Sequence, residues 1–479
     1  MKLYIVTLLT ALSLIGCKDK TTEDSGFTYF GGVIINPNNN YVIISGKSAK
    51  MDTLYLDSKN RFHHKIKNLG AGMYTFAHGG EYQMMVLEPN DSLLIRLNTN
   101  AFDESLVFTG KGSKKNNFLI KSFLRDEKAN KKIIKYNTLE PELFETLIDS
   151  VKTSKLNNLE LFLDKIPSSD FFKKIAKANI NYNYYTYKEI YPFGYYGKKQ
   201  LVHFKDLPDG FYDFRSEIDY NDNELTNLAP YNRFLFWHFS NLALKNYYKN
   251  SHDHHDFNRM SLDYNLEKLN LIDTLVEDET IKNYLLEHHA REFIFNSKNN
   301  DESNKLLNSY LEKNTNKKSE SHIKRLVESM SNLTPGNKLP YVEILDFGNN
   351  TISLSSVIKQ PTVIYFWSSN FKMHYRNSHY AAKELKEKYP DVNFIAINMN
   401  DTDLNYWKKT LKQFKYSVKN EYKLKNPNVA FKKLALEFSS KAIIVDAKAK
   451  IINSNTNLFS EDLGIELENL LAKNKKALK

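Results

Sequence analysis

Histidines and one cysteine are the side chains of this sequence with the strongest potential for chemistry. The densest group lies in one short stretch and consists of His252, His254, His255 and Asp256. Imidazole and carboxylate groups bind zinc or copper, but this spacing matches no fixed metal geometry. We therefore interpret the stretch as a solvated loop, with zinc or copper binding kept as an alternative, and predict no cofactor. Adjacent His288 and His289 diverge on a predicted helix, and we interpret them as structural.

Cys17 is the only cysteine in the 479 residues. Residues 1–16, MKLYIVTLLTALSLIG, predict a secretory signal peptide. The tetrapeptide Leu14-Ile15-Gly16-Cys17 resembles a bacterial lipobox, which implies cleavage before Cys17 and acylation of that residue. We expect residues 17–26 to form a lipidated tether that holds the protein in the cell envelope, on the periplasmic or the outer face of the outer membrane. An acylated Cys17 would leave the mature chain without a thiol nucleophile.

Composition indicates a folded protein of several domains. Hydrophobic residues make up 41% of the chain, and 67 basic against 56 acidic residues give a formal net charge of +11. The charges are interleaved and form no long basic arm, so we predict no nucleic-acid binding. At roughly 100–200 residues per domain, the length suggests about three domains. Changes in pattern divide the chain into a β-rich part at 27–110, a helical part at 111–330 and an α/β part at 334–475.

The first two parts differ in periodicity. Residues 27–110 contain short segments of alternating polarity separated by turn residues, which predict a small antiparallel β-sandwich or barrel. Residues 111–330 contain apolar residues at helical spacing, which predict an all-α domain. Within it, the stretch 181–196 holds seven tyrosines. Tyrosines pack between helices, but they also bind sugars and peptides, so both interpretations stay open.

The third part alternates strands and helices. We predict strands at 361–367, 392–398, 441–446 and 449–453, and helices at 371–389, 403–415, 427–437 and 460–473. This order predicts an α/β sheet that closes with a hairpin around Asp446-Ala447-Lys448.

Several segments of this part resemble the thioredoxin/redoxin family, membrane-anchored disulfide-reductase subgroup. They are LSSVIKQPTVIYFWSS (354–369), KYPDVNFIAINMND (388–401) and KAIIVDAKAKI (441–451). LDSKNRFHHKIKNLGAGMYTF and LEPNDSLL, in the first part, resemble the β-domain that precedes such domains in Bacteroidetes lipoproteins. The resemblance implies a thioredoxin-like fold for residues 334–475 and a multidomain α+β chain.

The resemblance does not extend to the reactive residues. The family carries a Cys-x-x-Cys pair at the start of the first helix, where this chain has Phe371 and His374. The family's cis-proline before the strand at 441–446 corresponds to Ser440. His374 has no orienting partner that the sequence identifies, so we do not predict that it acts as a general base. Disulfide exchange is therefore not expected, and we predict no catalytic residue.

We predict instead that the third part binds a protein or peptide partner in the envelope. A thioredoxin-like surface can hold an extended peptide through backbone hydrogen bonds, and such a surface can persist without thiols. We expect Trp367, Phe371, Met373 and Ser440 to contribute to it. Two alternatives stay open: a thiol-disulfide oxidoreductase as in the resembled family, and glycan or peptide binding through the tyrosine-rich helical part.

Overall fold

The structure is a computed structural model that describes residues 27–46, 51–194, 204–250, 257–369, 372–400 and 404–477. The chain divides into two compact units. One comprises Met1–His78, Tyr82–Asn130 and Leu161–Ala176, and the other comprises Gly79–Glu81, Lys131–Glu160 and Lys177–Lys479. The division follows neither residue 110 nor residue 334, because the long helices between residues 113 and 194 contribute to both units.

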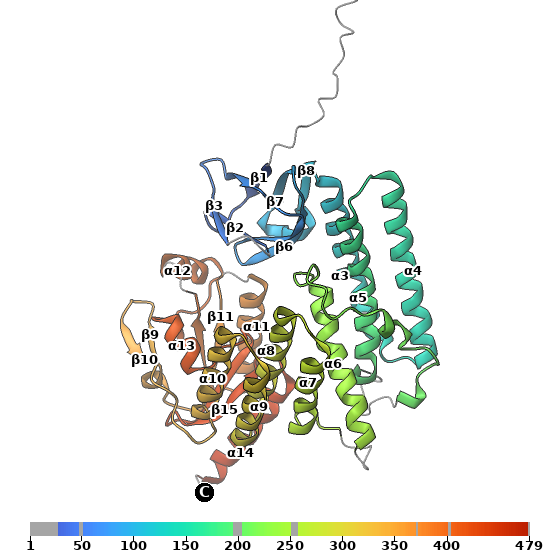
Figure 1. The fold of residues 1–479 in the computed structure, drawn as a ribbon. Helices are drawn as coiled ribbons and strands as arrows, with labels where there is room; N and C mark the ends of the chain where they lie inside the picture. The colour runs from blue at the N-terminus through green and yellow to red at the C-terminus, as the bar shows by residue number, and fades with distance from the viewer. Residues whose placement is uncertain are drawn as a thin grey trace, which may run out of the picture. The chain divides into compact units, whose positions relative to one another are not determined.

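The β-rich part contains two four-stranded sheets (Figure 1). Their orders are β4-β1-β7-β8 and β3-β2-β5-β6, and they share a core that includes Phe30, Phe76 and Leu93. The strands are β1 Phe27–Ile35, β2 Tyr41–Gly46, β3 Asp52–Tyr55, β4 Arg61–Lys67, β5 Gly72–His78, β6 Glu81–Leu87, β7 Ser92–Asn98 and β8 Val107–Lys111.

One strand pair corrects the expectation of a wholly antiparallel sandwich. Strands β1 and β7 pair in parallel, from Tyr29 opposite Ser92 to Ile35 opposite Asn98. The pairs β1–β4, β7–β8 and β2–β5 are antiparallel. Because β1 and β7 are far apart in the sequence, no hairpin turn imposes an antiparallel direction on them.

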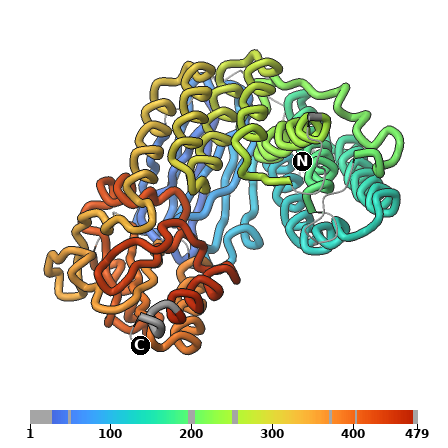
Figure 2. The backbone as a smooth tube through the Cα atoms, turned by 90° about the horizontal axis from the view of Figure 1, so that it is seen from below, coloured from blue at the N-terminus to red at the C-terminus, as the bar shows by residue number. Residues whose placement is uncertain are grey.

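Most described residues between 113 and 332 lie in long helices. They are α3 Ser113–Tyr136, α4 Pro141–Lys165, α5 Asp170–Gly194, α6 Ala229–Asn250, α7 Leu262–Leu275, α8 Glu279–Asn296, α9 Asn300–Lys313 and α10 Lys317–Asn332. Helices α7 to α10 each begin after a side chain that accepts hydrogen bonds from first-turn amides; these N-caps are Ser261, Asp278, Asn299 and Asn316. Helices α6 to α10 pack side by side in the second unit (Figure 2).

The C-terminal part contains a seven-stranded mixed sheet with the order β10-β9-β13-β12-β11-β14-β15. Its elements are β9 Glu343–Leu345, β10 Thr351–Ser353, β11 Thr362–Trp367, α11 Lys372–Lys388, β12 Asn393–Asn398, α12 Leu404–Gln413, β13 Glu421–Leu424, α13 Pro427–Lys433, β14 Lys441–Val445, β15 Ile451–Asn457 and α14 Glu461–Ala477. Each predicted strand and helix of this part overlaps an observed element, and the closing hairpin β14–β15 is present. Some bounds differ: α13 ends at Lys433 and not at 437, and β15 is Ile451–Asn457 and not 449–453. Strands β9, β10 and β13 were not predicted.

The helical bundle of the second unit contacts the segment that precedes β14. Phe295 of α8 packs against Phe438 with ring centroids 5.0 Å apart, and the Phe295 carbonyl accepts a hydrogen bond from Asn455. His322 of α10 contacts Glu437 at 3.1 Å. In this unit, bundle and sheet therefore share an interface of aromatic and ionic contacts.

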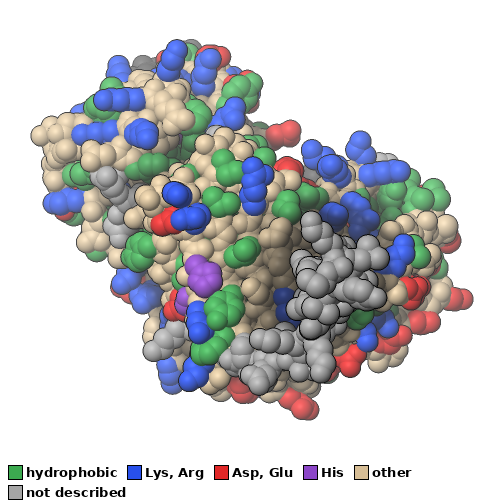
Figure 3. Space-filling view, turned by 90° about the horizontal axis from the view of Figure 1, so that it is seen from above, with side chains coloured by type: hydrophobic (Ala, Val, Ile, Leu, Met, Phe, Trp, Pro, Cys, Tyr) green, Lys and Arg blue, Asp and Glu red, His purple; other side chains and the backbone are tan. Residues whose placement is uncertain are grey.

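The described residues show neither a metal-like cluster nor a membrane-spanning helix. No group of three His, Cys, Asp or Glu side chains in the described ranges could hold a metal ion. In the same ranges, no helix is both long and apolar enough to cross a membrane. Lysine and arginine side chains are spread over several parts of the face drawn in Figure 3, with acidic side chains also present on that face.

Candidate functional site

The predicted site begins where β11 ends. Every residue of this strand is buried, and the chain then passes Ser368 and Ser369 to reach α11. Phe371 lies outside the described residues. Trp367 is fully buried and packs edge-on against Tyr375 and His379. Trp367 therefore belongs to the core, whereas we expected it to contribute to the binding surface: β11 is an interior strand of the sheet, between β12 and β14, and its last side chain packs against α11.

The first turn of α11 carries the other two predicted residues of the motif. Met373 is 69% exposed, so its thioether side chain is available for contact. His374 is half-buried against Phe459, and burial lowers the pKa of its imidazole. Among the described residues no carboxylate forms an ion pair with His374, whose Nε2 lies 3.5 Å from Ser378 Oγ. No carboxylate there orients it as a general base.

Ser440 lies directly before β14, and its backbone takes part in the hydrogen bonding of this segment. Its carbonyl accepts a hydrogen bond from the Leu458 amide at 3.0 Å. The next residue, Lys441, is buried, and its amine donates to the carbonyls of Leu434 and Ala435 at 2.8 and 3.0 Å. Burial lowers the pKa of Lys441 to about 7. These contacts hold the segment in place next to the end of α13.

A buried His–Glu pair near the predicted motif was missed by sequence reasoning. His379 Nε2 lies 2.8 Å from Glu421 Oε1, and His379 Nδ1 lies 2.7 Å from the Tyr375 carbonyl. The Tyr416 ring stacks on the imidazole with centroids 3.8 Å apart. Because Nδ1 must donate to the carbonyl, the contact between Nε2 and Oε1 must also contain a proton. Burial raises the pKa of Glu421, and its bond to His379 lowers it in part.

A groove of about 650 Å³ opens above this pair, between α11 and the segment that leads into β13. Tyr365, Phe394 and Ala396 are among the sheet residues that line it. Its basic lining residues are Arg376, Lys383, Lys386, Lys415 and Lys419. Glu421, already bound to His379, is the one acidic residue among its described lining residues. Met373 and Tyr380 add exposed apolar surface at 69% and 64% exposure. We call this site the basic groove.

A signal for part of the basic groove was present in the sequence. Arg376, Tyr380, Lys383 and Lys386 are spaced at i, i+4, i+7 and i+10, which places them on one face of α11. Lys383 also approaches Glu387 at 3.9 Å, but both side chains are well exposed, so this pair neutralises little charge. The contribution of Lys415 and Lys419 could not be foreseen, because β13 was not identified.

The remaining predicted residues are placed as follows. Cys17 and the group His252, His254, His255 and Asp256 lie outside the described residues. Tyr182, Tyr184, Tyr185 and Tyr191 of the tyrosine-rich stretch are at most 8% exposed. Their rings pack against one another and against neighbouring phenylalanines, as in the pair Phe144–Tyr191 with centroids 4.0 Å apart. These four tyrosines are core residues and offer no platform for a glycan.

Comparison with known proteins gives neighbours by structure only. No protein-family model and no curated protein matches the chain. Solved structures with thioredoxin-like names match a part of it. A proposed thiol-disulfide oxidoreductase from Bacteroides vulgatus is 24% identical and covers 29% of this chain and 98% of its own, with a TM-score of 0.26. The thioredoxin domain of a thiol-disulfide oxidoreductase from the same species is 17% identical over 29% and 96%, with a TM-score of 0.23.

A thioredoxin-like protein from Bacteroides caccae covers more of the chain. It is 14% identical over 44% of this chain and 78% of its own, with a TM-score of 0.30. These similarities concern the fold of a part of the chain, and we derive no activity from them.

Proposed function

We propose that this chain is a lipid-anchored envelope protein whose C-terminal part binds an acidic segment of a partner protein without exchanging disulfides. The observation that carries the proposal is the absence of any cysteine after Cys17 in the full sequence. Thiol-disulfide exchange requires a thiolate, and the positions of the resembled Cys-x-x-Cys pair are Phe371 and His374. Binding of a partner protein needs no thiolate, so this surface can bind a partner without disulfide exchange.

The charge of the basic groove supports an acidic partner. Five basic side chains line it, and its one acidic lining residue is engaged by His379. Exposed Met373 and Tyr380 offer apolar contacts within the same groove. An extended segment with carboxylates and one or two apolar side chains is complementary to such a surface.

Charge reversal in the groove tests this proposal. The double variant Lys415→Glu/Lys419→Glu should lose binding to a fluorescent hepta-glutamate peptide, measured by anisotropy, by at least tenfold. Lys409→Glu/Lys412→Glu changes the charge equally on α12, outside the lining of the groove, and should bind as the wild type does. Equal affinity of both double variants, or no binding by the wild type at low salt, would contradict the proposal.

Partner capture then identifies the segment. Crosslinking of the native protein in its own envelope, followed by mass spectrometry, should recover a partner that Lys415→Glu/Lys419→Glu and Met373→Asp both fail to capture. A partner retained by both variants would contradict a role for the basic groove.

The oxidoreductase alternative is tested by thiol chemistry. Maleimide labelling of the mature chain under denaturing conditions should show no free thiol if Cys17 is acylated. Loss of lipid incorporation and of membrane association in Cys17→Ser would support the anchor. Reduction of insulin disulfides by the mature chain would overturn the non-catalytic assignment.

A further inference from the structure

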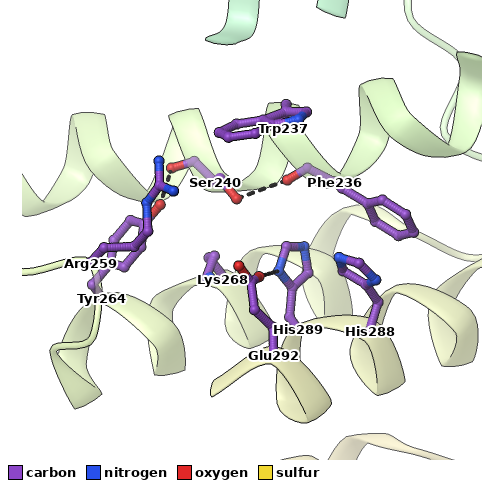
Figure 4. Close-up of a pocket in the computed structure, with 9 residues that line it drawn as sticks. All are labelled: Phe236, Trp237, Ser240, Arg259, Tyr264, Lys268, His288, His289 and Glu292. Carbon is purple, nitrogen blue, oxygen red and sulfur yellow. Dashed lines mark hydrogen bonds and ion pairs between the residues drawn. The ribbon is translucent and has the colours of Figure 1, made fainter. Parts of the chain in front are cut away.

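A second cavity lies among helices α6, α7 and α8, and its volume is about 190 Å³ (Figure 4). Helix α6 contributes Phe236, Trp237 and Ser240, α7 contributes Tyr264 and Lys268, and α8 contributes His288, His289 and Glu292; Arg259 precedes α7. At about 30 Å³ per water, the cavity has room for about six waters or a small organic molecule. The cavity is distinct from the basic groove, which is lined by residues 365–421.

Lys268 is the most unusual group of this cavity. The residue is only 3% exposed, and no hydrogen bond or ion pair reaches its amine from the described residues. The ring of Tyr264 lies 4.8 Å from Lys268 Nζ and supplies a cation–π contact. A buried ammonium group is costly unless it is paired, so this lysine is poorly accounted for by structure alone.

His289 is the second unsatisfied group, and it is 2% exposed. Neither of its ring nitrogens has a hydrogen-bond partner among the described residues. Glu292 Oε2 lies 3.9 Å from Nδ1, beyond hydrogen-bond distance. Burial and the neighbouring charge of Lys268 hold the pKa of His289 well below its usual range, so the ring is neutral and can offer one N–H.

The other walls are aromatic or lie towards solvent. Phe236 stacks on His288 with centroids 3.7 Å apart, and Trp237 approaches the guanidinium of Arg259 at 5.4 Å. The side chain of Glu292 is 46% exposed, so water compensates part of its charge. The deep end of the cavity thus offers hydrogen-bond donors, and its sides offer aromatic surface.

We propose that this cavity binds a small organic carboxylate, whose oxygens accept hydrogen bonds from Lys268 Nζ and from an N–H of His289. The apolar part of the ligand would pack against Phe236, Trp237 and Tyr264. Such a ligand satisfies both unpartnered groups at once and neutralises the buried ammonium. A neutral ligand of the same shape would leave that ammonium unpaired. The inference is independent of the basic groove and survives if the proposed function fails.

The test uses benzoate as the probe, with the purified full chain and isothermal titration calorimetry. Wild type should bind benzoate and not benzamide, its neutral analogue. Lys268→Met should lose benzoate affinity at least tenfold. Lys245→Met, at an exposed position of α6, should bind as the wild type does. Equal affinity of wild type and Lys268→Met, preference for inorganic phosphate over benzoate, or no binding by wild type would each overturn the proposal.

Two measurements on the wild type keep the test independent of the variants. Benzoate should protect Lys268 from acetic anhydride, as measured by peptide mass spectrometry, while Lys245 is modified equally with and without it. Burial lowers the pKa of Lys268 to about 8, so affinity should fall about tenfold for each pH unit above this value. Two other charged groups act on the Lys268 amine: Glu292 raises its pKa, and Arg259 lowers it. The imidazoles of His288 and His289 stay neutral across this pH range. Equal labelling of Lys268 with and without benzoate would contradict the site.

Discussion

Helix α6 borders two buried clusters of ionisable side chains, and the clusters differ in how far their polar groups are satisfied. In the first, Glu189 binds Arg215 Nη2 at 2.5 Å and His238 Nδ1 at 2.7 Å. Asn241 donates to the Glu189 carbonyl, and Tyr220 lies 2.9 Å from His238 Nε2. In the second, Lys268 and His289 face a cavity without such partners.

The effect of burial on the pKa of the ionisable groups also differs between the two clusters. Although burial alone would raise the pKa of Glu189, Arg215 and His238 lower it below its ordinary value. Burial is not offset in the same way at Lys268, whose pKa is lowered to about 8. A fully satisfied cluster rigidifies a core, whereas each buried polar group without a partner beside a cavity needs a separate explanation.

The largest expected effect comes from breaking the satisfied cluster. Glu189→Ala leaves the charge of Arg215 and the imidazole of His238 buried without their carboxylate, so unfolding in urea should show a loss of about 3–5 kcal/mol. Glu160→Ala, exposed on α4, should change the free energy of unfolding by less than about 0.5 kcal/mol. A loss below about 1 kcal/mol for Glu189→Ala would show that the cluster is not a rigid part of the core.

Replacing Lys268, in the cluster without partners, should raise the free energy of unfolding instead of lowering it. The pKa of Lys268 is lowered in the folded state, so its burial penalty is fully present below pH 8 and disappears as pH rises towards 10.5. Lys268→Met should therefore raise the free energy of unfolding by about 1–3 kcal/mol at pH 7, and this gain should vanish near pH 10.5. Destabilisation by Lys268→Met at pH 7 would show that the amine is structurally satisfied after all.

His322 is a partly exposed residue whose two ring nitrogens both have carboxylate partners. Hydrogen bonds that its imidazolium donates to Glu287 and Glu437 raise the pKa of His322 to about 9, against a smaller opposing effect of burial. A raised pKa gives stability that is fully present below pH 6.5 and lost as pH rises through 9. His322→Gln should cost about 1–2 kcal/mol at pH 6 and nothing above pH 9.5, as measured by chemical unfolding across this range. A cost that does not depend on pH would assign the effect to packing instead.

The smallest stability effect is expected in the basic groove. Met373→Ser removes an exposed side chain, and Lys415→Glu/Lys419→Glu changes exposed charges, so each should change the free energy of unfolding by less than about 0.5 kcal/mol. Binding of the acidic peptide is the property that should change. A stability loss above about 1 kcal/mol in either variant would make these residues structural.

Sequence patterns predicted the C-terminal part better than the rest. Strand β11 is a continuous apolar run between turn residues, and the alternation of strands and helices that follows it is a strong signal. Strand β13 was not predicted, because Glu421 and Lys423 are charged residues that occupy buried positions. A search for alternating apolar residues does not find such a strand.

For the candidate sites too, some features could be predicted from the sequence and others could not. The lack of a thiol at the Cys-x-x-Cys positions follows from residue identity and needs no coordinates. The burial of Trp367 and of the tyrosines does not, because aromatic side chains serve equally in cores and at surfaces. His288 and His289 were interpreted as structural because neighbours on a helix diverge, yet His289 faces a cavity formed by three helices.

The sequence by itself determined that no cysteine follows Cys17 and determined the order of the C-terminal strands and helices. Both depend on local information: which residue occupies a position, and how apolar residues repeat along the chain. Only the tertiary structure decided which ionisable groups are paired and which are not. Glu189 binds Arg215 and His238 of other elements, and His379 of α11 binds Glu421 of β13. Burial acts on each of these groups through the whole fold that surrounds it.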